Sequence, residues 1–106
     1  MSYRFMRMIL FFDLPVEKEK QKKAYRRFVK LIKSEGFYLI QKSVYVKMGI
    51  DIQALNSSIN KIKKELPTEG NIFVISITEK QFANIVFLVG DHSSDVISSD
   101  SRYIEL

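Results

Sequence analysis

The residue best placed to do chemistry is Asp13, because it directly follows the apolar run Ile9–Phe12 and precedes the turn signal Leu14-Pro15. A carboxylate is a hard oxygen ligand that suits Mg²⁺ or Mn²⁺, and such ions assist phosphodiester cleavage. One carboxylate is too few for a tight site, but a dimer would supply two copies of Asp13. The plainer alternative is a turn or helix N-cap aspartate, with Pro15 in the first helical turn. The residues alone leave both interpretations open.

The other potential nucleophiles and bases are poorly placed for catalysis. His92, the only histidine, lies in a polar, serine-rich stretch with no partner motif. The serines of that stretch lack a paired base as well: Ser93, Ser94, Ser98 and Ser99. The chain has no cysteine, no dinucleotide-binding or Walker loop, no zinc-protease motif and no RNP1 pattern. Solvated loop therefore explains residues 90–101 better than an active site does.

A second candidate function is nucleic-acid binding through a basic tract. The net charge is +5, and residues 17–33 carry eight lysines and arginines against two glutamates. Residues 79–106 reverse this balance, with two basic side chains against five acidic ones. Basic surfaces attract polyanions. The candidate contacts are Lys20, Lys22, Lys23, Arg26, Arg27 and Lys30. Because many proteins carry one basic helix without binding nucleic acid, charge alone does not decide.

Regular elements must position these side chains, and the spacing of apolar residues predicts them. We expect strands over 3–12, 37–40, 43–48 and 71–77, and helices over 17–35 and 51–66. Asp51 is the expected N-cap of the second helix. Thr78–Gln81 matches a capping box, which should open a short helical turn. A last apolar strand is expected over 84–90, and strand character returns at 102–106.

The order βαββαβ, followed by an extra C-terminal β segment, predicts an α+β ferredoxin-like sandwich with two helices on one side of a four-stranded antiparallel sheet. The 106 residues and the hydrophobic fraction of 46% suit one core. We expect that core over 1–89, with 90–106 as a polar linker and C-terminal strand for dimer or partner contact. No run reaches the roughly 18 apolar residues of a membrane span, and no secretory signal is evident, so we expect a cytoplasmic protein.

Three stretches together resemble the family of the second CRISPR-associated protein, the small subunit of CRISPR adaptation. They are "MILFFDLP", "SEGFYLIQKSVYVKM" and "GNIFVISITEKQF". They occur in the family's order and spacing, out to about Val89. An aromatic-Asp pair ending the first strand, then Gly, then Gln-x-Ser-Val-aromatic, makes the combination specific. The likeness is nearest to the branch found with type II systems.

The resemblance implies a symmetric homodimer with magnesium-dependent endonuclease activity, with Mn²⁺ as an alternative metal, on single-stranded RNA or duplex DNA. It also implies a complex with the CRISPR integrase, the first CRISPR-associated protein. In that complex the small dimer bridges two integrase dimers and helps hold the prespacer DNA, and this role can be architectural. A stand-alone, toxin-like mRNA interferase on the same fold is the alternative function.

The resemblance also assigns individual residues. The family's metal-binding aspartate falls on Asp13. The aromatic residue before it, commonly tyrosine, is Phe12 here. Phe12 lacks the hydroxyl, so its ring can pack but cannot form a hydrogen bond to the site. The motif of the second and third strands falls on Gln41, Ser43, Val44 and Tyr45. The family's basic residues match the basic tract without a one-to-one alignment. The tail matches only in kind: such tails add a strand across the dimer or against the integrase, here through Arg102, Tyr103 and Ile104.

Overall fold

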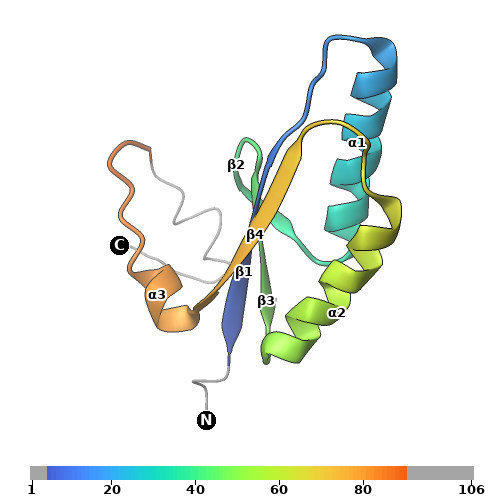
Figure 1. Cartoon of the computed structure of the whole chain (residues 1–106). Helices are drawn as coiled ribbons and strands as arrows, with labels where there is room; N and C mark the ends of the chain where they lie inside the picture. Colours follow the sequence, from blue (N-terminus) through green and yellow to red (C-terminus); the bar gives the residue numbers. More distant parts are fainter. Residues whose placement is uncertain (1–4, 91–106) are drawn as a thin grey trace.

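Residues 5–90 are described by a computed structural model, in which two helices lie on one side of a twisted antiparallel sheet (Figure 1). The four strands have the spatial order β2-β3-β1-β4. They are β1 (Met6–Asp13), β2 (Tyr38–Gln41), β3 (Val44–Gly49) and β4 (Asn71–Thr78). The helices are α1 (Glu19–Ser34), α2 (Ile52–Ile62) with the 3-10 turn η2 (Lys63–Glu65), and α3 (Glu79–Ala83). This is the predicted α+β, ferredoxin-like βαββαβ sandwich.

The centre of β1 carries apolar side chains on both faces, and each face packs against other parts of the chain. Side chains alternate along a strand, so Met8, Leu10 and Phe12 point toward the helices while Ile9 and Phe11 point to the other side. β1 pairs with β3 over Met6 to Phe11 and with β4 over its whole length. The last register pair on the β4 side joins Asp13 to Asn71.

The main core lies between the sheet and the two long helices. The apolar stripe of α1 buries Phe28 and Ile32, and α2 buries Leu55 and Ile62, all against Leu10 and its neighbours on β1. Each such side chain contributes about 1.5–3 kcal/mol through removal of its apolar surface from water. The predicted caps are confirmed. The Asp51 carboxylate accepts from the Ala54 N–H at 2.9 Å, and the Thr78–Gln81 capping box opens α3.

The opposite side of the sheet is called the open face here. It presents the odd-numbered residues of β1 and β4: Arg7, Ile9, Phe11, Asp13, Asn71, Phe73, Ile75 and Ile77. Phe82 of α3 packs there with Ile9 in a smaller core. Arg7 fastens α3, because its guanidinium bonds to Glu79 and the Tyr38 hydroxyl and lies 4.4 Å from the centre of the Phe82 ring.

Several predicted boundaries are wrong. The expected strand over 84–90 does not form: α3 ends at Ala83, and the following residues join no sheet. The segment belongs to none of the four strands of the sheet formed within residues 5–90, and Val86, Leu88 and Val89 are 76–91% exposed. The second helix ends at Ile62 instead of 66, because the chain tightens into η2.

The predictions for 91–106 lie outside the described residues. Among the described helices, none is long and apolar enough to cross a membrane.

Candidate functional site

Asp13 is the last residue of β1, and its side chain is exposed on the open face. Within residues 5–90 its carboxylate forms no hydrogen bond and no ion pair. The backbone around it is tightly fixed by Gly70, which has a φ of +98°. A Cβ atom at Gly70 would lie 2.7 Å from the Asp13 carbonyl oxygen and 2.6 Å from the Leu14 side chain. Only glycine therefore lets the chain entering β4 approach the end of β1 so closely.

The structure also decides against the plain interpretation of Asp13. Helix α1 begins at Glu19 with Lys18 as its N-cap, so neither Asp13 nor Pro15 belongs to the helix terminus. An aspartate that shapes a turn accepts a backbone N–H with its side chain. The Asp13 carboxylate accepts none from the described part of the chain. Within residues 5–90 the Asp13 side chain has no hydrogen-bonding partner, and it is exposed.

The aromatic residue before Asp13 belongs to the core. Phe12 is buried, with the rings of Tyr25 and Phe28 packed edge-on at centroid distances of 5.6 and 5.4 Å. The ring of Tyr45 stacks on Phe12 at 5.9 Å. Burial raises the pKa of the Tyr45 hydroxyl, and the neighbouring Tyr25 adds to this effect. Phe12 therefore anchors the strand end by packing, and Tyr45 stays protonated at neutral pH.

The family motif after β2 holds the same strand end through the backbone. Ser43 lies in the left-handed region with a φ of 68°, which is uncommon for a residue with a side chain. Its carbonyl oxygen accepts the Phe12 N–H at 3.1 Å. Val44 pairs with Phe11 across β3 and β1, while Gln41 is exposed beside a bulge in β2. The contact between Ser43 and Phe12 depends on tertiary structure, so the sequence pattern alone gave no reason to expect it.

The basic residues of α1 lie on the other side of the molecule. Lys20, Lys22, Lys23, Arg26, Arg27 and Lys30 are all exposed, and they are called the basic surface of α1. None of them forms an ion pair within the described residues. Because the apolar stripe of α1 packs on the helix side of the sheet and these exposed side chains lie outside that stripe, this surface faces away from the open face. The structure thus separates the two predicted sites, Asp13 and the basic tract, instead of joining them.

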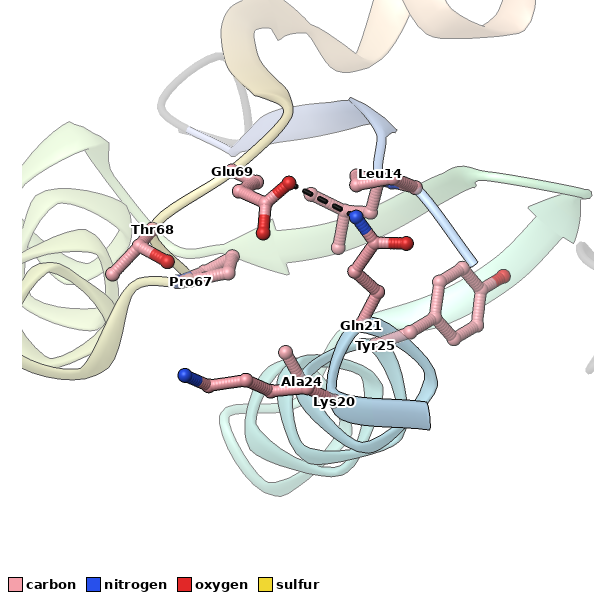
Figure 2. A pocket seen from close by; sticks show the side chains of 9 residues that line it. Leu14, Lys20, Gln21, Ala24, Tyr25, Pro67, Thr68 and Glu69 are labelled. Atoms are coloured by element: carbon pink, nitrogen blue, oxygen red, sulfur yellow. Dashed lines mark hydrogen bonds between the residues drawn. The ribbon is translucent and has the colours of Figure 1, made fainter. Parts of the chain in front are cut away.

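A small cavity of about 130 Å³ lies between the start of α1 and the loop after α2 (Figure 2). Gln21 spans it, since its amide nitrogen donates to a Glu69 carboxylate oxygen at 3.0 Å. The amide oxygen of Gln21 accepts the backbone N–H groups of Glu17 and Lys18 at 3.0 and 2.9 Å. Gln21 therefore fixes the connection that leads from Asp13 into the basic helix. A Gln three residues after an N-cap is part of the capping-box pattern. The pattern was missed here because the N-cap is a lysine instead of the usual Ser or Thr.

Comparisons with known proteins now decide the family. The family model "CRISPR associated protein Cas2" matches residues 6–85. The chain belongs to the Cas2 family. A Streptococcus mutans protein named CRISPR-associated endoribonuclease Cas2 is 43% identical over 101 residues, which cover 95% of this chain and 93% of that protein. A Treponema denticola protein of the same name is 36% identical, over 95% of this chain and all of the relative.

Solved structures agree on the fold. A structure described as "Crystal structure of cas2" superposes with a TM-score of 0.61, covering 95% of this chain and 99% of the other. The two sequences are 19% identical, so this likeness concerns the Cas2 fold alone. The partner-binding residues predicted in the tail, Arg102, Tyr103 and Ile104, lie outside the described residues, as does His92.

The donor set around Asp13 limits the kind of metal that a Cas2 protomer could hold. Residues 5–90 contain no group of three or more His, Cys, Asp or Glu side chains that could enclose an ion. What the strand end offers is an exposed carboxylate on Asp13 and the amide of Asn71 on the neighbouring strand. Hard oxygen donors in small number suit Mg²⁺, which usually keeps several of its water ligands. The residues fit an open, largely hydrated magnesium site and do not fit a closed structural one.

Proposed function

We propose that this Cas2 family member is the small subunit of CRISPR spacer acquisition. It would act as a homodimer that bridges integrase dimers and binds prespacer DNA, with a metal-dependent endonuclease activity centred on Asp13. The observation that carries this proposal is the division of the chain into two surfaces. The basic surface of α1 is exposed and forms no ion pair with any residue of 5–90, while Asp13 lies on a face with exposed apolar side chains that would suit a second copy.

The open face supports the homodimer. Phe73 and Ile75 are 62% and 50% exposed there, although both belong to a strand. β4 is also an edge strand, because within residues 5–90 it pairs only with β1. Exposed apolar side chains next to an unpaired strand edge mark an association surface. A second copy placed on this face by a two-fold axis would cover it and would bring both copies of Asp13 to one interface.

The basic surface of α1 supports the nucleic-acid role. Its cations remain available for phosphates because no acidic side chain of the described chain neutralises them. Duplex binding should therefore weaken steeply with salt, and each phosphate contact removed by mutation should lower the log–log salt slope by about one. Lys22→Glu, Arg26→Glu and Lys30→Glu together should abolish most duplex binding at physiological salt. Unchanged binding by this triple variant would remove the surface from the proposal.

The nuclease activity would depend on the chain's own carboxylates. Two Asp13 side chains at one interface repel each other, and this repulsion favours capture of a cation between them. Mg²⁺, when bound, would act as a Lewis acid on the phosphodiester and would lower the pKa of a bound water. Asp13 would hold the ion, and the buried Phe12 would keep its backbone in place. The names of the relatives, CRISPR-associated endoribonuclease, support RNA as one substrate.

Spacer integration in vitro tests the proposal most directly. The assay combines the cognate integrase, a short duplex and either the wild-type protein or Asp13→Ala, with the dimer checked by light scattering. If Asp13→Ala dimerises and integrates normally, the adaptation role is architectural and the nuclease activity is separate. If integration fails while the dimer and the complex persist, Asp13 acts directly in adaptation. Normal integration without any of this protein would overturn the proposed role.

A further inference from the structure

The side chain that lies next to Asp13 on the open face is Asn71. The two residues form the last register pair between β1 and β4. Directly opposed residues of antiparallel strands project to the same face, with Cβ atoms roughly 4.5–5.5 Å apart. The preceding pair on this face, Phe11 and Phe73, confirms the arrangement, because the two rings stack at 4.8 Å. Asp13 and Asn71 therefore present a carboxylate and an amide side by side.

Neither side chain is used to stabilise the fold. Both are exposed, and within residues 5–90 neither forms a side-chain hydrogen bond or an ion pair. Their backbones, by contrast, are fixed by the register and by Gly70, which precedes Asn71 and lies against the Asp13 carbonyl group. A rigid strand end that displays two adjacent, unused oxygen donors is better suited to a ligand than to folding.

We propose that Asn71 is a second ligand of the cation site at Asp13, with its side-chain amide oxygen binding the same divalent ion. Amide oxygens are accepted ligands of hard divalent cations. In a dimer, two Asp13 carboxylates already balance the double positive charge. A neutral amide from each copy adds a donor without adding negative charge. Asn71 thus raises the affinity and fixes the position of the ion. This inference rests on the proposed Asp13 site, so its test must separate the two.

Mn²⁺ binding by the full-length protein, measured by electron paramagnetic resonance, provides a readout besides nuclease activity. Asn71→Leu should weaken Mn²⁺ binding by on the order of tenfold, as is typical when a supporting group of a metal site is removed. Asn71→Asp keeps an oxygen in the same place and should bind Mn²⁺ at least as well as the wild type. Asn60→Leu, the same change on the exposed side of α2, is the matched control and should have no effect.

The outcomes distinguish the inference from the proposal beneath it. If Asp13→Asn abolishes Mn²⁺ binding but Asn71→Leu binds normally, Asn71 is not a ligand and the Asp13 site stands. If the wild-type dimer binds no Mn²⁺, or Asp13→Asn binds it normally, both assignments fail. Equal loss in Asn71→Asp and Asn71→Leu would show that the amide acts in another way, which also overturns the inference. Circular dichroism and light scattering establish that each variant is folded and dimeric.

Discussion

The two faces of the sheet differ in how far the described chain buries their apolar side chains. On the helix side, Leu10, Ile32 and Leu55 are fully buried within the chain. On the open face, Phe82 covers Ile9, but Phe73 and Ile75 remain at least half exposed. Apolar residues of β1 face both sides, with Leu10 toward the helices and Ile9 toward the open face, but on the neighbouring β4 the described chain leaves Phe73 largely exposed. The helix side therefore accounts for folding, and the open face is left for association.

The largest expected effect concerns the core on the helix side of the sheet. Phe28 is 1% exposed and packs on Phe12 at a centroid distance of 5.4 Å. Phe28→Ala should lower the free energy of unfolding by about 3–5 kcal/mol, because it removes a buried ring and leaves a cavity. Urea denaturation followed by circular dichroism measures this loss. Phe73→Ala, which removes an exposed ring, is the comparison variant. Equal destabilisation by both would contradict the distinction between the faces.

A charge on the open face should disturb association instead of folding. Ile75 is 50% exposed, so Ile75→Lys should be tolerated by the isolated protomer. A symmetric dimer would carry the change twice, and burying two unpaired ammonium groups is costly. Analytical ultracentrifugation should therefore show mainly monomer where the wild type is dimeric. Leu39→Lys is the control, because Leu39 is similarly exposed at 51% but lies on β2, the other edge strand. A dimer that survives Ile75→Lys would place the interface elsewhere.

Much of this arrangement could be predicted from periodicity. The first helix, the Asp51 cap and the Thr78–Gln81 capping box depend on neighbours in sequence, and all three are confirmed. The strand expected over 84–90 was wrong, because tertiary contacts decide whether an apolar segment joins a sheet through a neighbouring strand. Local pattern contains no information about that neighbour.

Some residues of the candidate site could be predicted from the sequence and others could not. Asp13 could be identified from its place after an apolar run and from the family resemblance. Its neighbour Asn71 could not, because the register of β1 against β4 fixes that contact. The contact of Ser43 with Phe12 and that of Gln21 with Glu69 likewise join residues far apart in the chain. Spacing rules detect residues that share an element, and these pairs do not.

A smaller effect is expected from Gln21, which organises the connection between the two proposed sites. Gln21→Ala removes the acceptor for the Glu17 and Lys18 N–H groups and the bond to Glu69. The free energy of unfolding should fall by about 1 kcal/mol, the usual loss for a helix cap. Thermal unfolding measures it. Gln53→Ala on α2 is the matched control, since Gln53 is exposed and caps nothing. A loss no larger than in Gln53→Ala would mean that the cap is not stabilising.

The smallest effect appears only in alkali and compares one tyrosine from each face. Burial raises the pKa of both Tyr45, on the helix side, and Tyr38, on the open face, where Arg7 opposes the shift. In the folded protein both hydroxyls therefore stay protonated at pH values above 10.0, the ordinary pKa of tyrosine. Unfolded tyrosines release protons first, so each contributes stability that is intact below pH 10 and declines as the pH rises further. Thermal unfolding between pH 8 and 11 should show this decline, and Tyr45→Phe and Tyr38→Phe should each reduce it. A decline unchanged in both variants would assign it to other groups.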